Sequence, residues 1–157
     1  MDRRHIFLVV VILATAMAYL TIVVGGDLTA SGSGLACGGS WPFCPGGVIP
    51  NFTDFGVVIE FTHRVVAFAT SLLVLAALLL AIKWFRRASW LLYLSVVTFL
   101  LLAAQVLLGM ATVQSNLNDA VVTAHLALGT ATFAAALVLT VVMLIRPPPA
   151  QTPAAPS

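Results

Sequence analysis

Four long apolar segments dominate the sequence and limit what it can fold into. They cover residues 6–24, 57–82, 90–113 and 120–145. A bilayer hydrocarbon core of about 30 Å needs about 20 helical residues to cross it, and each segment is long enough. Backbone polar groups in lipid must be satisfied within the chain, so the segments should be helices. We therefore predict an all-α integral membrane protein, a bundle of four transmembrane helices.

The composition supports a membrane protein. Apolar residues make up 61% of the chain and charged residues 8%, and the mean hydropathy is +1.11. These values do not suit a soluble domain with a charged surface. The lipid bilayer is the expected partner, and no nucleic-acid partner is expected. The first segment exceeds the 7–15 apolar residues of a usual signal peptide, so we expect it to remain as a span.

The basic residues predict the orientation in the membrane. Six of the seven lie before the first segment, between the second and third, or after the fourth: Arg3, Arg4, Lys83, Arg86, Arg87 and Arg146. Residues 25–54 and 114–119 contain no Lys or Arg. By the positive-inside rule, both termini are cytoplasmic and the long loop between the first two helices is extracytoplasmic. We expect a multi-pass protein of the cell (plasma) membrane.

The segments form one expected domain. Residues 1–146 should form a single four-helix transmembrane domain. Residues 147–157, rich in Pro and Ala, are expected to be a disordered tail. Aromatic and apolar residues of the long loop, Trp41, Phe43 and Ile49 among them, are expected to pack as a lid on the membrane face.

A weak internal repeat divides the chain into two similar hairpins. Val24-Gly25-Gly26 ends the first apolar segment, and Leu108-Gly109-Met110 lies near the end of the third. A segment with a histidine near its outer end follows each of them. The repeat predicts two helical hairpins of one design.

These histidines, His63 and His125, are the main candidates for chemistry. Both follow the outer start of their segment, about 10 Å deep at 1.5 Å per residue. The second and fourth helices should run parallel and lie diagonally in the bundle. Titratable residues within a membrane are costly and usually functional. Two facing imidazoles can hold a metal from both sides, most commonly haem iron. Alternatively, each histidine hydrogen-bonds a carbonyl group or a neighbouring helix.

Three polar residues accompany this pair. Glu60 lies one turn before His63 and shares its face. Glu60 either pairs with Arg64 at the interface or acts as an acid, base or charge stabiliser beside a bound ring. Arg64 alternatively binds a propionate, because guanidinium suits carboxylates. Gln105 is either a helix-to-helix contact or a ligand contact.

Cys37 and Cys44 are the two cysteines, and both lie in the long loop. A disulfide between them would be stable outside the cytoplasm. Such a bond is either a structural staple or a redox-active pair, and the spacing, which is not C-x-x-C, favours the staple.

Several motifs resemble the haem A synthase family. Residues 31–37 with Trp41-Pro42-Phe43-Cys44 are similar to its first outer loop, and Glu60-Phe61-Thr62-His63-Arg64 to its E-x-x-H-R motif. Residues 105–109 and 124–128 resemble its third and fourth helices. The similarity covers nearly all of residues 1–146.

The resemblance implies roles for individual residues. His63 and His125 would be axial haem ligands, Glu60 the catalytic carboxylate, and Cys37 and Cys44 the extracytoplasmic disulfide. The implied reaction is oxidation of a ring methyl of haem O to a formyl group. Haem A is then the product for terminal oxidases, and haem b the cofactor. A haem O-producing enzyme and an electron acceptor are the further partners.

The chain resembles one half of the usual family member, which has eight spans in two fused four-helix halves. We therefore expect a homo-oligomer, most simply a dimer. Two other functions stay open. A non-enzymatic b-type cytochrome needs the same histidine pair and gives Glu60 no role. A thiol–quinone oxidoreductase has outward cysteines but generally needs a C-x-x-C pair and a second pair.

Overall fold

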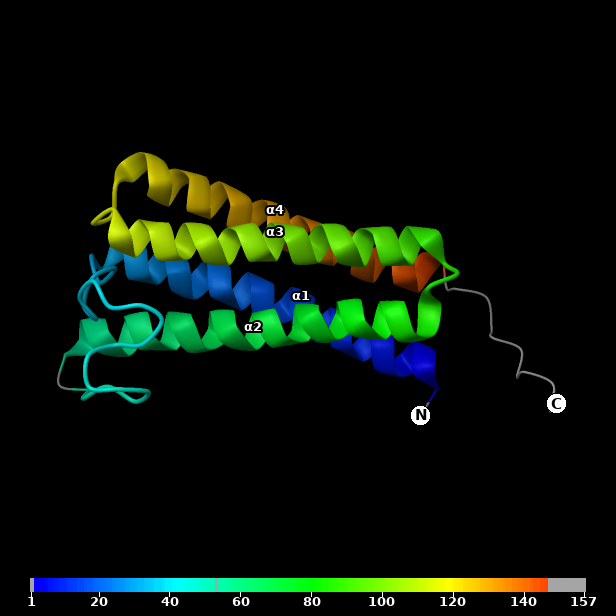
Figure 1. The fold of residues 1–157 in the computed structure, drawn as a ribbon, viewed down its shortest axis with the longest axis horizontal. Helices are drawn as coiled ribbons and strands as arrows, with labels where there is room; N and C mark the ends of the chain where they lie inside the picture. The colour runs from blue at the N-terminus through cyan, green and yellow to red at the C-terminus, as the bar shows by residue number, and fades with distance from the viewer. Residues whose placement is uncertain (1, 53, 147–157) are drawn as a thin grey trace.

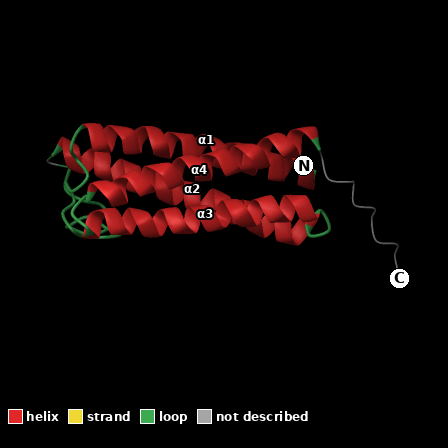
Figure 2. Cartoon of the chain, turned by 90° about the horizontal axis from the view of Figure 1, so that it is seen from above, coloured by secondary structure: helices red, strands yellow, loops and turns green. Residues whose placement is uncertain are grey.

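A computed structural model describes residues 2–52 and 54–146. Four helices form an elongated bundle: α1 (Arg3–Ala30), α2 (Phe55–Phe85), α3 (Ser89–Gln114) and α4 (Asp119–Ile145). All four are long and apolar enough to cross a membrane. The predicted all-α, four-span membrane bundle is confirmed (Figures 1 and 2). The tail expected at residues 147–157 lies outside the described residues.

The helix boundaries follow local chemistry. Asp54 begins α2 because its carboxylate accepts a 2.7 Å hydrogen bond from the Gly56 N–H. Asn118 begins α4 by accepting a 3.1 Å bond from the Ala120 N–H. The tight link before it places Asn116 and Leu117 in the left-handed region, at φ 52° and 60°. Its N–H groups cap α3, as when Leu117 donates to the Thr112 carbonyl.

Helix α1 is longer than the apolar segment that predicts it. The prediction ended at Val24, whereas the helix continues through Gly25 and Gly26 to Ala30. Thr29 contributes by donating its hydroxyl proton to the Gly25 carbonyl at 3.0 Å. The long loop is therefore residues 31–54.

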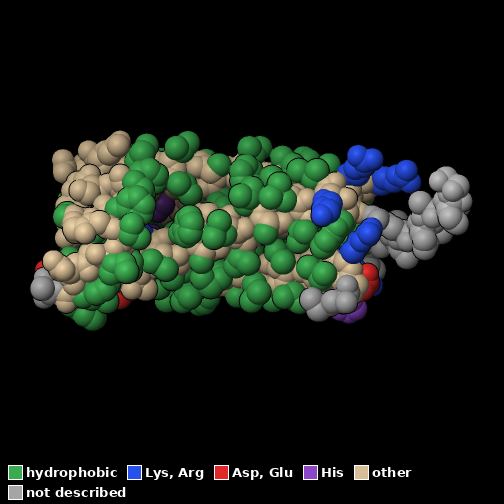
Figure 3. Space-filling model, turned by 60° about the horizontal axis from the view of Figure 1, so that its bottom comes forward, with side chains coloured by type: hydrophobic (Ala, Val, Ile, Leu, Met, Phe, Trp, Pro, Cys, Tyr) green, Lys and Arg blue, Asp and Glu red, His purple; other side chains and the backbone are tan. Residues whose placement is uncertain are grey.

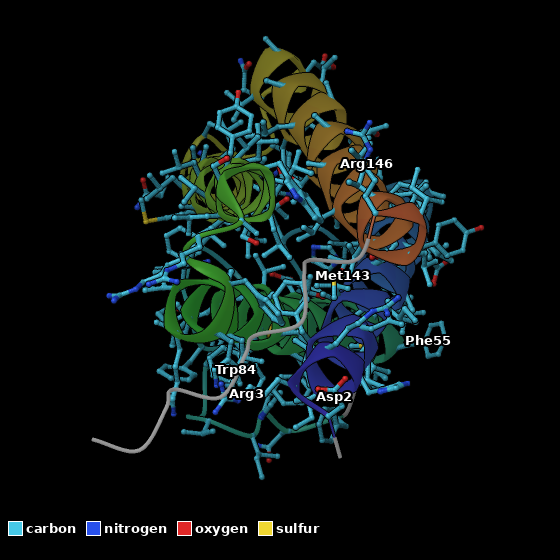
Figure 4. The ribbon with its side chains drawn as sticks, turned by 90° about the vertical axis from the view of Figure 1, so that its right-hand side faces the viewer. Asp2, Arg3, Phe55, Trp84, Met143 and Arg146 are labelled. Atoms are coloured by element: carbon cyan, nitrogen blue, oxygen red, sulfur yellow. A yellow bond between two sulfur atoms is a disulfide. The ribbon has the colours of Figure 1, made fainter. Side chains whose placement is uncertain are left out.

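The helices follow one another around the bundle axis (Figure 4). The packed pairs are α1 with α2, α2 with α3, α3 with α4, and α4 with α1. In the described part of the chain, no Cα atoms of α2 and α4 lie within 8 Å of each other, so these helices lie diagonally. This arrangement is the one predicted for the two histidine-bearing helices.

The two ends of the bundle differ. The end with the N-terminus, here called the terminal end, has an apolar core, which includes Phe7, Ala81, Leu91 and Met143. A second apolar cluster lies farther along. The opposite end, here called the loop end, carries residues 31–54 and the α3–α4 link.

The outer surface suits lipid. Large apolar side chains of all four helices are exposed and cover the side of the bundle in Figure 3, while Lys and Arg gather at the terminal end. The expected lid is wrong in one respect. Trp41, Phe43 and Ile49 are exposed rather than packed on the bundle. Phe52 of the same loop does pack on the bundle, with its ring edge-on to Phe61 of α2 at 5.5 Å. Polar contacts, described below, also hold the loop.

Candidate haem site at the loop end

The His63 ring faces α1. A Cβ atom placed on Gly25 would lie 3.0 Å from Cε1 of His63, so the ring sits directly against the glycine backbone. The Thr21 backbone lies beside the same ring. The Nδ1 atom of His63 is buried and has no hydrogen-bond partner.

His125 lies in a matching environment against α3. A Cβ atom on Gly109 would lie 3.1 Å from its Cε1. The Gln105 amide donates toward Nε2 of His125 at 3.4 Å. The Nδ1 atom of His125 and the Oε1 atom of Gln105 are buried without partners. Gln105 is itself held close to α4, since a Cβ on Gly129 would lie 2.9 Å from its Nε2.

The two environments confirm the internal repeat. In each hairpin, a glycine of the first helix makes room for a histidine of the second. Four residues before each glycine stands a polar residue, Thr21 before Gly25 and Gln105 before Gly109. The bundle thus places the two predicted histidines on diagonal helices in matching environments.

Glu60 and Arg64 hold the long loop on the head of α2. Glu60 is 2% exposed. Its Oε1 pairs with the Arg64 guanidinium, and its Oε2 accepts a 2.7 Å bond from the Cys37 N–H. Arg64 also donates to the Ser40 and Pro42 carbonyls at 2.9 and 3.0 Å. The interfacial Glu60–Arg64 pair, one of the two alternatives from the sequence, is therefore present.

Cys37 and Cys44 form a disulfide, as expected. Both are buried, at 1% and 5% exposure. All three loop groups that Glu60 and Arg64 contact lie within residues 37–44, the ring that the disulfide closes. The disulfide-closed segment 37–44 is therefore hydrogen-bonded to α2 on both sides of His63, through Glu60 before it and Arg64 after it.

Sequence reasoning identified the polar side chains and the glycines Gly25 and Gly109 of the repeat, but not the contacts between them. Gly25, Gly109 and Gly129 admit the rings and the amide, and the Cys37 N–H donates to the Glu60 carboxylate. The shared four-residue spacing from Thr21 to Gly25 and from Gln105 to Gly109 was the available signal. The contacts of Arg64 with Ser40 and Pro42 use backbone carbonyls, which every residue type carries, so the sequence contains no pattern that predicts them.

The site fits a haem by its own chemistry. Each imidazole has a buried nitrogen without a partner, and unpaired buried polar atoms are rare unless something binds there. The glycines leave the backbone bare beside each ring. Figure 3 shows a histidine side chain at the bottom of a recess among apolar side chains toward the loop end. Within residues 2–52 and 54–146, no three His, Cys, Asp or Glu side chains form a set for a bare metal ion.

Fold and site together define a class: four-span helical membrane proteins with an interior histidine pair. A model of the COX15-CtaA family, cytochrome oxidase assembly protein, matches residues 8–157. The heme A synthase of Geobacillus kaustophilus (strain HTA426) is 34% identical over 131 residues, 83% of this chain and 41% of the relative. That of Bacillus mycoides (strain KBAB4) is 32% identical over 127 residues, 80% and 41%.

The chain belongs to the COX15-CtaA family of cytochrome oxidase assembly proteins. It spans about 41% of the length of these curated relatives.

Proposed function

We propose that this protein is a haem-binding oxidoreductase of the outer membrane leaflet that converts haem O to haem A. The observation that carries the proposal is the pair of interior imidazoles, each with an unpartnered buried nitrogen, on diagonal helices. The names of the relatives, heme A synthase, support the substrate and the product. The reaction oxidises one ring methyl to a formyl group. With water as the source of the formyl oxygen, it releases four electrons and four protons, and the electrons pass to a separate electron acceptor.

In this proposal His63 and His125 would hold haem b or haem O. Bound haem iron supplies one-electron redox chemistry. Gly25 and Gly109 fix how closely each imidazole approaches the neighbouring helix. The Gln105 amide nitrogen donates toward the lone pair of His125 Nε2, so the ring proton lies on Nδ1 while this contact is made. Haem iron would bind through a nitrogen lone pair and would replace the Gln105 amide at Nε2.

Glu60 is the proposed catalytic carboxylate. It lies one turn before His63, and Arg64 and the Cys37 N–H keep it in place. A fixed negative group there stabilises positive charge that develops on the substrate ring, or accepts the proton that leaves the methyl group. Preorganised charge is effective in a water-poor site because no reorganisation is needed during the reaction. Arg64 is proposed to bind a propionate with the N–H groups that remain.

The test is Glu60→Gln, with Asp27→Asn as the matched control. Both changes remove one carboxylate at the loop end, and Asp27 is exposed on α1. Each variant is loaded with haem O, and the pigment is extracted and examined for the formyl product. The proposal expects Glu60→Gln to bind haem and convert it about 100-fold more slowly, and Asp27→Asn to react normally. A Glu60→Gln variant that binds haem and reacts at the normal rate excludes the catalytic role.

One observation favours a second candidate, a non-enzymatic b-type cytochrome. Both carboxylate oxygens of Glu60 already have partners within the chain, which also suits a purely structural residue. Extracted pigment distinguishes the two candidates. A formyl haem after loading with haem O requires the synthase, and unchanged haem O supports the cytochrome.

The proposed setting is the cell membrane, with both termini cytoplasmic and the disulfide loop outside. One chain provides one histidine pair. We propose a homo-oligomer, most simply a dimer, in which two copies provide two haem sites. A haem O-producing enzyme and an electron acceptor are the proposed partners.

A further inference from the structure

Large apolar side chains are exposed along the long loop and at the head of α2. Their exposed fractions lie between 42% and 75%, and they are Trp41, Phe43, Val48, Ile49, Phe52 and Phe55. Exposed apolar patches mark contact with another molecule or with a membrane. Residues 31–54 contain no Lys or Arg, and Asp54 is the one acidic residue among them. The partner of this surface must therefore be apolar rather than charged.

The loop lies beside the first turns of α2 rather than beyond the end of the helix. The Phe52 ring packs edge-on to Phe61, with 5.5 Å between the ring centroids. The Arg64 guanidinium donates to the Ser40 and Pro42 carbonyls at 2.9 and 3.0 Å. Phe61 and Arg64 lie about 9 and 14 Å from the start of α2, at 1.5 Å per residue. Figure 1 shows the same arrangement, with part of the loop running alongside the first turns of α2.

These contacts lie at the boundary of the hydrocarbon core. Lys83 ends the apolar part of α2 at the terminal end. A hydrocarbon core of about 30 Å takes about 20 helical residues, which are residues 63–82 when counted back from Lys83. Helical side chains tilt toward the helix N-terminus, so Arg64 reaches its loop partners just outside this core. The loop segment 40–52, whose two ends make these contacts, therefore lies in the headgroup layer next to the acyl chains.

The exposed surface of the loop continues the lipid-facing surface of α2. Four apolar residues of α2 share one face of the helix, at spacings of four, three and four: Phe61, Val65, Phe68 and Leu72. The last three are exposed on the side of the bundle. Phe52 packs on the first of them and extends this face toward the loop end. The lipid that surrounds the transmembrane helices is therefore the molecule adjacent to the loop surface.

We propose that residues 40–52 insert their apolar side chains into the lipid leaflet at the loop end. Interfacial segments bury apolar side chains about 5–10 Å into the boundary between headgroups and acyl chains, and Trp is typical of that layer. Insertion depends on apolar contact, because the segment has no basic side chain for anionic headgroups. The disulfide and the contacts of Glu60 and Arg64 hold the loop against α2 at this level. The inference does not depend on the proposed haem site.

The test uses Trp41 as a reporter of depth. The chain has three Trp, so the double variant Trp84→Phe, Trp90→Phe leaves Trp41 alone. The control adds Trp41→Phe and Asp119→Trp, because Asp119 is the exposed first residue of α4 at the same end of the bundle. By the same count back from Arg146, position 119 lies about 10 Å beyond the hydrocarbon core. Both proteins are placed in phosphatidylcholine vesicles, and their fluorescence is quenched either by bromine-labelled acyl chains or by aqueous iodide.

Trp41 should be quenched by the bromine-labelled lipid and shielded from iodide, and the reporter at position 119 should show the reverse. Quenching of Trp41 by iodide and not by the lipid overturns the proposal, because it places the loop in water. Protection from both quenchers also overturns it, since a protein surface such as a second copy of the chain then covers the loop. So does lipid quenching of Trp41 that requires added phosphatidylglycerol, because insertion would then depend on anionic headgroups.

A measurement on the wild-type protein decides the question if a variant does not fold. The protein is placed in phosphatidylcholine vesicles that contain a lipid with a photoactivatable diazirine in its acyl chain. After illumination and proteolysis, mass spectrometry should find the label in residues 40–52 as well as on the exposed face of α2. Label on α2 without label in residues 40–52 overturns the proposal.

Discussion

Replacing Gly25 with alanine should displace the His63 ring and weaken haem binding. The added Cβ would lie 3.0 Å from Cε1 of His63, whereas ordinary contacts are 3.4–4 Å. The ring must therefore give way by a few tenths of an ångström. A binding group must be held within about 0.5 Å of its productive position. We expect haem b affinity to fall about tenfold, or about 1.4 kcal/mol.

Gly26→Ala is the matched control. It lies next in the same helix, and a Cβ there meets nothing within 4 Å. Both substitutions improve helix propensity by up to about 1 kcal/mol, so a general effect on the helix appears in both. The assay is titration with haem b, followed by absorption, with thermal unfolding measured in parallel. Equal haem affinities for Gly25→Ala and Gly26→Ala would refute the reasoning.

The remaining predictions concern the loop and the topology. Arg64→Ala should lower the free energy of unfolding in detergent by about 3 kcal/mol, because it leaves the buried Glu60 carboxylate unpaired. The control Arg87→Ala, at an exposed site, should change the free energy of unfolding by less than about 0.5 kcal/mol. Equal effects of the two substitutions would contradict the Glu60–Arg64 pairing. The double Cys37→Ser, Cys44→Ser variant should lose about 2–3 kcal/mol, and reductant should lower the stability of the wild type and not of this variant. Alkaline phosphatase fused after Arg146 should be inactive and inserted within the 31–54 loop should be active; the reverse pattern would contradict the proposed orientation.

The bundle was predictable because lipid leaves the chain few choices. Each apolar segment had to be a helix, and short links place consecutive helices side by side. The diagonal placement of His63 and His125 followed from that order. The end of α1 did not follow, because Gly25-Gly26 is typical of a helix end. In the structure α1 continues through both glycines, and the His63 ring packs against the backbone at Gly25.

The site was predictable in its side chains and not in its backbone contacts. The spacing of Glu60 and Arg64 indicated a pair, which is present. Which loop groups they bind depends on how residues 37–44 fold, and those partners are an N–H and two carbonyls that every residue type carries. For Trp41 and Phe43 the side chains themselves were misjudged, because both were expected to pack and both are exposed. Apolar character alone does not distinguish contact with the bundle from contact with lipid.

The most direct test of the histidine pair is a haem b titration of three single variants. The wild-type protein should bind haem b with the absorption spectrum of iron held by two imidazoles. His63→Ala and His125→Ala should each lose that spectrum. His5→Ala, at an exposed position near the N-terminus, should retain it. If either His63→Ala or His125→Ala retains the wild-type spectrum and affinity, the two interior imidazoles do not hold a haem and the account is contradicted.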